Sequence, residues 1–560
     1  MTTIDTASPA VASRPRTGDR QGVVATLGAW LTTSDHKRLG RMMFGIGLVG
    51  LTGIAVVGGL IAMERIDVNS TFLGSGSVKY LLAMNRIGLA FFGVLPIVLG
   101  LAIAVVPLQL GARALAFPRL AAAGFWAWFF GMAMIVVSIC ANGGPAGGAS
   151  KYVALYIASF GVMLGGLTLI AISLATTVLT TRAPGMNMRR VPLFSWSVLV
   201  TSLGLIVMLP VVIGATIYVY VSYRYNRPAF GGSVGILDWT GFSVTQPQTY
   251  LYALPAIGFF AELVPVAARR RMPKRQVVLA GLGLVGVAAI AGVTQVPHVL
   301  PWSGSKLYLG HAGTKFGDLL NFGLFDVVPV LGAVLVLILA PLAFAPNRAN
   351  KANKANKTTP AAKVRPNISA AFVFGFFGLL MILAGMVGGI LYGVIDLGLQ
   401  GTVFEEGAYN YVSYGAVLAA LGAITYWGPK LWGRRIDDKK LYPIALLGMI
   451  GVVLASLPYY IAGFADQPAA SVTFHYSGPQ ALWNTLATIG QGLFALMVLA
   501  FAGLALKSFR SGETVGDDPW DAQTLEWATS SPAPVENFVA IHTVASPEPL
   551  IDLKPKTENA

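Results

Sequence analysis

Charged residues are scarce in this sequence of 560 residues. Only 11% of the residues are Asp, Glu, Lys or Arg, and 55% are hydrophobic, whereas a soluble globular chain usually carries about 25% charged residues. The mean hydropathy is +0.68, and a helix needs about 20 apolar residues to cross a bilayer. The composition therefore excludes a soluble enzyme and predicts an all-α membrane protein with many spans.

Cysteine and histidine are scarce as well. The single cysteine, Cys140, excludes a disulfide, a CxxC metal site or an iron–sulfur cluster within the chain. The five histidines are His36, His298, His311, His475 and His542. Only His298 lies near an apolar run, because the others fall in predicted tails or loops. A haem held by two histidines from membrane spans is therefore excluded.

Twelve apolar runs predict twelve transmembrane helices. The runs cover residues 40–63, 81–107, 121–141, 152–181, 194–223, 248–268, 277–300, 318–346, 370–398, 408–428, 441–464 and 482–507. An even number of spans places both chain ends on the same side of the membrane. They divide the chain into an amino-terminal tail (1–39), a membrane domain (40–507) and a carboxy-terminal tail (508–560).

Basic residues gather in alternate gaps between these runs. They include Arg113, Arg119, Arg182, Arg189, Arg190, Arg269, Arg270, Arg271, Lys274, Arg275, Lys430, Arg434, Arg435, Lys439 and Lys440. Lys and Arg concentrate on the cytoplasmic side of membrane proteins, so both tails and the basic linker at 347–366 are predicted to be cytoplasmic. The net charge of +15 is then expected to face lipid headgroups and not nucleic acid.

Glycine is abundant within the spans and in one loop. Small residues allow membrane helices to approach closely, so the glycines of the ninth span are expected to serve packing. The loop GGPAGG (143–148) lacks the strand before it and the Lys-Ser or Lys-Thr after it that a phosphate-binding loop requires. Nucleotide binding is therefore not expected.

Six segments carry a resemblance to a known family. They are SDHKRLG (34–40), VPLQLGARALAFPRL (106–120), PGMNMRRVPLFSWSVLV (184–200), YLYALPAIGFFAELVP (250–265), YWGPKLWGR (426–434) and DDPWDAQTLEWATSSPAP (517–534). In this order they resemble subunit I of cytochrome c oxidase, of the haem-copper oxidase superfamily. The resemblance implies a twelve-helix bundle with a low-spin haem, a high-spin haem and copper, which reduces oxygen and pumps protons.

The residues at the family's ligand positions differ from the family pattern. The resemblance places Asn85 at the low-spin haem ligand of the second span, and Ala408 and Asn410 at the two haem ligands of the tenth span. It places Gln246, and Pro297 with His298, at the copper ligands. Ala has no donor atom, and an amide oxygen is a hard, weak ligand for these metals. The substitutions predict that neither haem nor copper is bound.

Positions that hold the haem propionates or transfer protons in the family also carry residues of different chemistry here. Tyr459 and Tyr460 stand where an Arg pair holds the haem propionates, and phenols cannot neutralise carboxylates. Gln248 stands at the interior glutamate of a proton path and cannot titrate, while Ala114, Ala121 and Ala122 replace polar residues near the entrance of that path. Tyr250 remains at the family's cross-linked tyrosine, but its partner position is Gln246. We expect Tyr250 to be a packed, hydrogen-bonded residue.

Seven further residues are candidates for function, and simpler interpretations exist for them. His298 is expected at the outer membrane surface, and Met84 is expected to fill space in a helix. Asp326 lies inside the eighth span, where a carboxylate is either functional or a neutral or paired structural group. Glu262 is expected to pair with the basic run Arg269–Arg271. Asp396 flanks the outer loop before the tenth span, and the adjacent Glu405 and Glu406 there are expected to be solvated.

Three functions remain possible from the sequence. The first is a degenerate oxidase subunit I, a pseudoenzyme without haem or copper, which has a structural or regulatory role in a respiratory assembly of the bacterial plasma membrane. Its partners would be oxidase subunits II and III or a ligand-bearing paralogue, joined partly through segment 517–534. The second is an active terminal oxidase with unusual haem ligation. The third is a channel or carrier that uses the vacated interior, with Asp326 on the polar path.

Overall fold

The computed structural model describes most of the chain. The described residues are 28–67, 69–70, 72–227, 235–294, 316–345, 366–469, 471–472, 474, 478–540 and 543–553. Pro297, His298, His311, His475 and His542, together with residues 347–365 of the predicted basic linker, lie outside them. His36 is therefore the one histidine among the described residues.

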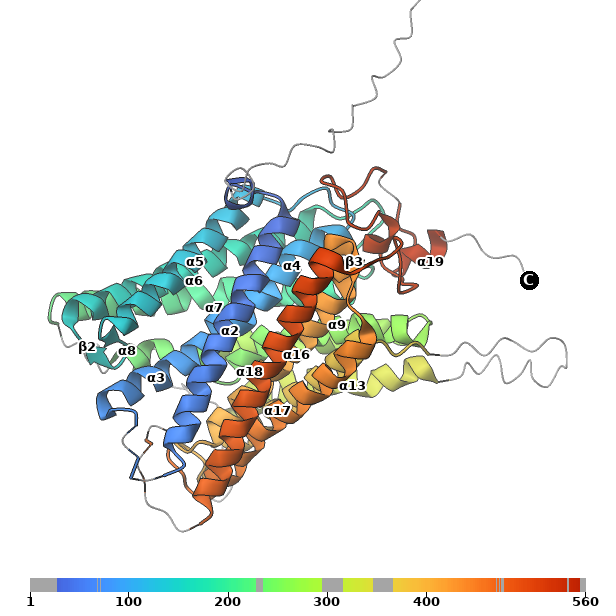
Figure 1. Cartoon of the computed structure of the whole chain (residues 1–560). Helices are drawn as coiled ribbons and strands as arrows, with labels where there is room; N and C mark the ends of the chain where they lie inside the picture. Colours follow the sequence, from blue (N-terminus) through green and yellow to red (C-terminus); the bar gives the residue numbers. More distant parts are fainter. Residues whose placement is uncertain are drawn as a thin grey trace, which may run out of the picture.

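Helices make up nearly all of the described structure (Figure 1). The long ones are α2 (His36–Glu64), α4 (Leu95–Gln109), α5 (Pro118–Cys140), α6 (Ser150–Thr180), α7 (Leu193–Arg224), α9 (Gln248–Ala268), α13 (Val328–Phe344), α15 (Ala370–Gly393), α16 (Phe404–Trp432), α17 (Asp438–Phe464) and α18 (Gln480–Ser511). The shorter ones are α3 (Ser75–Gly88), α8 (Gly235–Thr240), α10 (Arg275–Val285), α11 (Ala288–Thr294), α12 (Phe316–Phe322) and α19 (Pro549–Leu553). Two π-helical turns, η1 (Leu89–Val94) and η4 (Gly323–Val327), join α3 to α4 and α12 to α13.

Ten helical segments of the described chain are long and apolar enough to cross a membrane. They correspond to ten of the twelve predicted runs, which confirms a helical membrane bundle. The predicted tenth span is α16, which is 29 residues long but less apolar than the others. The predicted seventh span is described up to residue 294, as α10 and α11. The count of twelve stays a prediction.

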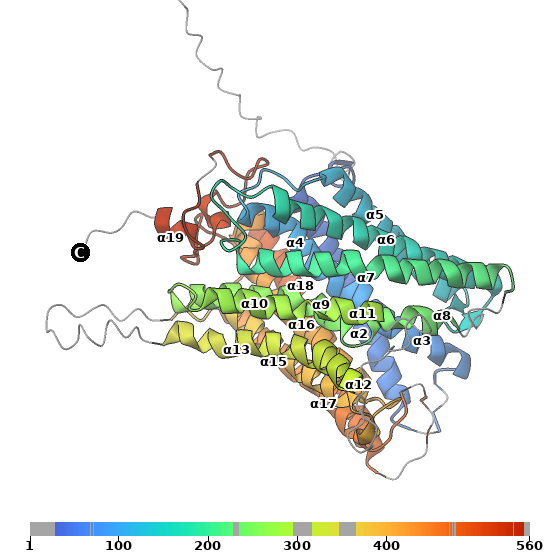
Figure 2. The same cartoon turned by 180° about the vertical axis from the view of Figure 1, so that it is seen from behind.

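The bundle is arranged around helices that have little or no exposed surface. The most apolar windows of α3–η1–α4 and of η3–α9, where η3 is Gly241–Val244, are completely buried, and α16 is buried along almost all of its length. On the rear face, α7, α10 and α13 run side by side (Figure 2). Close approach depends on glycine, since a Cβ on Gly378 of α15 would lie 2.6 Å from the Gly415 carbonyl oxygen of α16.

The carboxy-terminal residues do not form a free tail. We call residues 512–553 the C-terminal segment; it folds over the proximal end of the bundle, the end at which α2 begins and α18 ends (Figure 1). Lys430 of α16 donates hydrogen bonds to the carbonyl oxygens of Thr529 (2.6 Å) and Asp517 (3.1 Å), and the Trp520 indole donates to the Tyr426 carbonyl oxygen. The predicted carboxy-terminal tail is thus packed on the bundle, where these aromatic and polar side chains find partners.

Two short antiparallel pairs of strands complete the described structure. The GGPAGG loop forms β1 (Gly143–Gly144) and β2 (Gly147–Gly148) at the other, distal end of the bundle. β3 (Arg434–Arg435) pairs with β4 (Glu513–Thr514) and ties the end of α16 to the C-terminal segment. The glycine loop is therefore a hairpin between α5 and α6.

Candidate functional site

Several family ligand positions meet on a glycine face of α15. A Cβ on Gly388 would lie closer than 3.0 Å to the Tyr460 hydroxyl, with the Ala408 side chain next to it. A Cβ on Gly389 would clash in the same way with the Tyr250 hydroxyl and the Gln246 amide. The structure thus brings together residues from α9, α15, α16 and α17.

The tyrosine of this site is hydrogen-bonded to the residue at a copper position. The Tyr250 hydroxyl lies 2.9 Å from Gln246 Oε1 and 3.3 Å from the Met386 carbonyl oxygen, and its side chain is completely buried. This confirms the prediction of a packed, hydrogen-bonded tyrosine. Gln248 is also buried, at the first position of α9. The other copper positions, Pro297 and His298, lie outside the described residues.

The haem-ligand positions are occupied by residues engaged in packing. Asn410 Nδ2 donates to the Ala455 carbonyl oxygen (3.3 Å), and Asn85 Oδ1 is buried without a hydrogen-bond donor among the described residues. Ala408 is completely buried and has no donor atom. Met84 packs against the hydrophobic core, as predicted. Within the described chain, no three His, Cys, Asp or Glu side chains gather closely enough to hold a metal ion.

Two ion pairs join α16 to the first two predicted spans. Glu406 accepts two hydrogen bonds from the Arg65 guanidinium, at 2.8 and 3.0 Å, and Glu405 pairs with Arg86. The Arg65 side chain has no exposed surface. The prediction that these glutamates are solvated is therefore wrong. The sequence did not identify Arg65 and Arg86 as the partners of these glutamates. A possible signal was that two cations and two adjacent acids lie near the predicted outer ends of spans.

Aromatic side chains fill the space beside these ion pairs. Tyr460 stacks on Phe404 with ring centroids 4.4 Å apart and donates to the Ala384 carbonyl oxygen (3.0 Å). The Tyr459 ring lies 5.6 Å from the Arg65 guanidinium, in a cation–π arrangement. Tyr414 stacks on a phenylalanine of α18 at 3.9 Å. The positions of the propionate clamp thus hold rings that pack with the protein itself.

A small cavity lies in the bundle interior away from this site, twelve residues farther along α16 than Ala408. It lies between α4, α7, α9 and α16, is lined in part by Val98, Phe194 and Ala420, and measures about 10 Å³. A water molecule needs about this volume, whereas ligand pockets measure about 300–1,000 Å³. This cavity therefore has room for no more than one water molecule.

Two other acidic candidates lie near the same face. Asp326 is buried in the π-helical turn η4. This burial fits both a structural and a functional intramembrane carboxylate. Asp396 lies in a short 3₁₀ helix, Ile395–Leu397, and is exposed.

Glu262 has a different partner from the predicted one. Its carboxylate accepts hydrogen bonds from the backbone N–H groups of Leu193 (2.6 Å) and Phe194 (3.2 Å), at the first turn of α7. A helix amino terminus favours a carboxylate, since its N–H groups lack partners in the helix. The predicted pairing with Arg269–Arg271 is therefore wrong; Arg271 instead pairs with Asp552 of the C-terminal segment.

His36 is buried at the start of α2, where it contacts both the bundle and the C-terminal segment. Asp35 caps the amino terminus of α2 by accepting a hydrogen bond from Lys37 N–H, so the helix begins at His36. His36 Nδ1 lies 3.1 Å from the Ile103 carbonyl oxygen, and Nε2 lies 2.9 Å from Asn537 Nδ2. These partners fit a neutral imidazole that donates from Nδ1 and accepts at Nε2. His36 thus belongs to α2 and not to the predicted amino-terminal tail, because the helix starts four residues before the apolar run.

Comparisons with known proteins agree with this arrangement. Residues 38–493 match the family model described as "Cytochrome C and Quinol oxidase polypeptide I". The chain is 29% identical to the "Probable cytochrome c oxidase subunit 1-beta" of Nocardia farcinica, over 93% of this chain and 87% of that protein. It is 28% identical to the "Cytochrome c oxidase subunit 1" of Bacillus subtilis, over 93% and 82%. A "Putative cytochrome c oxidase subunit 1-beta" of Streptomyces coelicolor is 28% identical, over 96% and 93%.

Proposed function

The chain belongs to the family of cytochrome c and quinol oxidase polypeptide I, and from this premise we propose that it is a multi-pass membrane subunit that binds neither haem nor copper. In this proposal it is a pseudoenzyme with a structural or regulatory role in a respiratory membrane complex. It retains the helical scaffold of its family, while its ligand positions serve packing.

One observation carries the proposal: α16 forms ion pairs and ring contacts on its first turn, directly before the family's haem-ligand positions. Glu405 and Glu406 bind Arg86 and Arg65, and Ala408 and Asn410 follow on the next turn. An Arg–carboxylate pair with two parallel hydrogen bonds is among the stronger polar contacts in proteins, and buried space in a protein is normally filled. A haem at this helix would have to displace these contacts without gaining an imidazole ligand.

The proton-transfer positions support the same proposal. Gln248 cannot take up or release a proton at its amide, and it lies in the buried first turn of α9. The Gln246 amide oxygen accepts a hydrogen bond from the Tyr250 hydroxyl. The atom of Gln246 that a copper ion would need is therefore already engaged. Loss of metal ligands and of a titratable group in one region is expected when the chemistry is no longer carried out.

The two alternatives lead to different observations. An active oxidase would require haem ligands other than those at the family positions. A channel through the vacated interior would require a continuous polar path, but Asn410 and Gln246 are engaged in hydrogen bonds. Ion flux into proteoliposomes that disappears in Asp326→Ala would favour the channel over our proposal.

The proposed setting follows from the relatives. The relatives named above come from bacteria, so we place the protein in the bacterial plasma membrane with both termini on the cytoplasmic side. Oxidase subunits II and III, or a paralogue that carries the histidine ligands, are the proposed partners. Segment 517–534 contacts the bundle of its own chain, so any contribution to partner binding comes from its outer surface.

The direct test is haem and metal analysis of the intact protein. The full chain, purified from membranes with its associated subunits, is examined by reduced-minus-oxidised absorption spectroscopy and by iron and copper determination. We expect no haem spectrum and no copper in the band that contains this chain after the subunits are separated under native conditions.

A family member that retains all six ligand histidines, prepared in parallel, serves as the positive control. One haem per polypeptide in this chain would overturn the proposal. Haem found in the complex but assigned to a separate paralogue would support it, because that outcome places the chemistry in the partner.

A further inference from the structure

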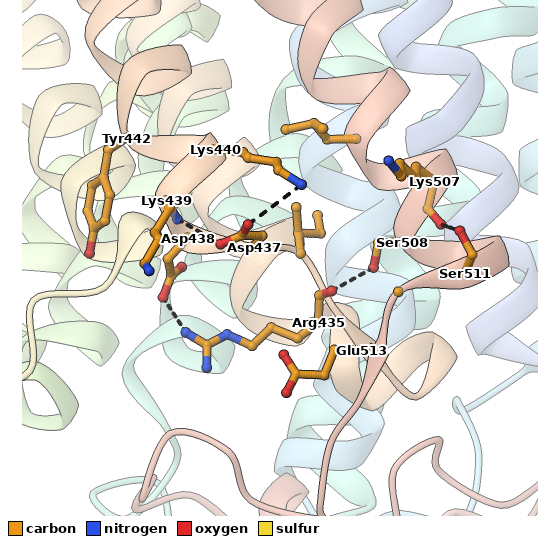
Figure 3. Close-up of a pocket in the computed structure, with 13 residues that line it drawn as sticks. Arg435, Asp437, Asp438, Lys439, Lys440, Tyr442, Lys507, Ser508, Ser511 and Glu513 are labelled. Carbon is orange, nitrogen blue, oxygen red and sulfur yellow. Dashed lines mark hydrogen bonds and ion pairs between the residues drawn. The ribbon is translucent and has the colours of Figure 1, made fainter.

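A cavity of about 610 Å³ opens at the proximal end of the bundle (Figure 3). One wall is the first turn of α17, and the opposite wall is the last turns of α18. The paired strands β3 and β4 contribute Arg435 and Glu513. The cavity lies apart from the ligand positions on α15 and α16 and belongs to no site described above.

The cavity is lined by charges of both signs, with cations in excess. The charged residues are Arg435, Lys439, Lys440, Lys507, Asp437, Asp438 and Glu513. Arg435 is committed to Asp438 (2.5 Å) and also lies over the Trp520 ring. Lys440 pairs with Asp437 only at 3.7 Å and in an exposed position, where an ion pair contributes little. Lys507 makes no ion pair among the described residues.

The two weakly engaged lysines face each other across the cavity. Figure 3 shows Lys440 extending from α17 and Lys507 from α18, toward the same space. Two ammonium groups on opposite walls can bind one phosphate through charge-assisted hydrogen bonds. With four cations and three carboxylates in the lining, a ligand with a single negative charge balances the site.

Apolar surface leads from the cavity along both helices. On α17, Tyr442 lines the cavity, and Leu446 and Ile450 follow at intervals of four residues, all exposed. On α18, the exposed Leu499 lies eight residues before Lys507. Residues at such spacings share a helix face. A free phosphate would use only the cavity, whereas a lipid would also cover these faces with its acyl chains.

We propose that this cavity binds the headgroup of an anionic phospholipid, with the phosphate between Lys440 and Lys507 and the acyl chains along α17 and α18. Basic pockets between membrane helices at the membrane surface suit such headgroups. The apolar faces distinguish a lipid from free phosphate as the source of the charge. The excess of one cation favours a phospholipid with one net negative charge over a zwitterionic one.

Lipid binding to the full-length protein tests this assignment. The delipidated protein is titrated in detergent with phosphatidylglycerol, phosphatidylethanolamine or inorganic phosphate, and bound molecules are counted by native mass spectrometry. We expect the unmodified protein to prefer phosphatidylglycerol. Lys440→Ala/Lys507→Ala should weaken its binding by about tenfold to thirtyfold, because each lysine near the surface contributes a modest attraction.

Two further variants control for charge and folding. Lys440→Arg/Lys507→Arg keeps both charges and should retain the lipid. Lys79→Ala/Lys151→Ala removes two lysines at the distal end and should leave phosphatidylglycerol binding unchanged. Equal affinity of the unmodified protein for phosphatidylethanolamine, or binding of inorganic phosphate as strong as that of phosphatidylglycerol, would overturn the proposal without reliance on any variant. Unchanged binding in the double alanine variant would overturn it as well.

Discussion

At the residue scale, the most consequential feature is the ion pairing of Glu405 and Glu406. Charged side chains in membrane proteins usually pair with one another or face a cavity, and here both partners come from helices far away in the sequence. Arg65 also donates to the Ala469 carbonyl oxygen (2.7 Å). Its guanidinium is therefore satisfied by the protein alone, as expected for a group that stabilises the fold.

Removal of Arg65 should destabilise the protein strongly. Arg65→Met leaves Glu406 without its partner, and breaking a buried pair from one side costs about 3–5 kcal/mol of unfolding free energy. The double variant Arg65→Met/Glu406→Met should recover much of this loss, because no unpaired charge remains. Unfolding in detergent, followed by circular dichroism, measures both effects.

The matched control is Asp552→Asn, which removes an ion pair with the half-exposed Arg271. It should change stability by less than about 1 kcal/mol. Equal losses of unfolding free energy in Arg65→Met and Asp552→Asn would show that the buried ion pair contributes no more to stability than the exposed one.

At the element scale, α15 approaches its neighbours through glycine. Gly378 packs on α16, whereas Gly388 and Gly389 receive the hydroxyl groups of Tyr460 and Tyr250. Without strong hydrophobic driving force between membrane helices, close backbone approach and interhelical hydrogen bonds hold them together. The glycine face is thus a packing surface for these two tyrosines.

A methyl group on this face should disturb the bundle. In Gly388→Ala the new Cβ would clash with the Tyr460 hydroxyl, so we expect a loss of about 1–3 kcal/mol of stability from overpacking. Adding Tyr460→Phe removes the hydroxyl and should restore part of that loss. Thermal unfolding of the variants in the same detergent gives the comparison.

Gly165→Ala provides the control, since no heavy atom lies within 4 Å of the added Cβ. It should be neutral or slightly stabilising, as Ala is the better helix former. If Gly388→Ala behaved like Gly165→Ala, the contact between α15 and α17 would be looser than described.

At the scale of the whole molecule, the C-terminal segment closes the proximal end of the bundle. Glu526 is completely buried and accepts hydrogen bonds from Gln109 (3.2 Å) and Trp427 (3.1 Å). Burial raises the pKa of the Glu526 carboxyl above its usual value, and these hydrogen bonds offset only part of the effect. Lys430 holds neighbouring carbonyl groups of the same segment.

Docking of the C-terminal segment should weaken as the pH rises. Because the pKa of Glu526 is higher in the docked state than in the free segment, docking favours the protonated carboxyl. The associated stability is present below the usual glutamate pKa of about 4.3 and is lost as the pH rises through the docked-state pKa. Hydrogen exchange of residues 512–553 at a series of pH values measures this dependence.

Glu526→Gln should flatten the pH dependence, since the amide cannot ionise, while Glu536→Gln should leave it unchanged because Glu536 is exposed. Protection of the segment that increases toward alkaline pH would contradict the assigned direction.

Part of the candidate site was accessible from the sequence. The resemblance placed Gln246 and Ala408 at ligand positions, Tyr250 at the family's cross-linked tyrosine and Tyr460 at the propionate clamp. The structure brings these four residues together against the glycine face of α15. The partners of Glu405, Glu406 and Glu262 were not accessible, and the solvated or basic-run interpretations failed. Local charge patterns predict exposed pairs well, but they do not reveal which distant backbone or guanidinium group reaches a buried carboxylate.

The membrane character, the helical class, the family and the residue types at the ligand positions can all be read from the amino-acid sequence. These properties depend on composition, apolar run length and side-chain identity, all of which are local. The folded bundle is needed to show that Arg65 meets Glu406 across 341 residues and that His36 meets Asn537 across 501. Such contacts depend on how helices pack in three dimensions. The same packing places the C-terminal segment over the proximal end of the bundle.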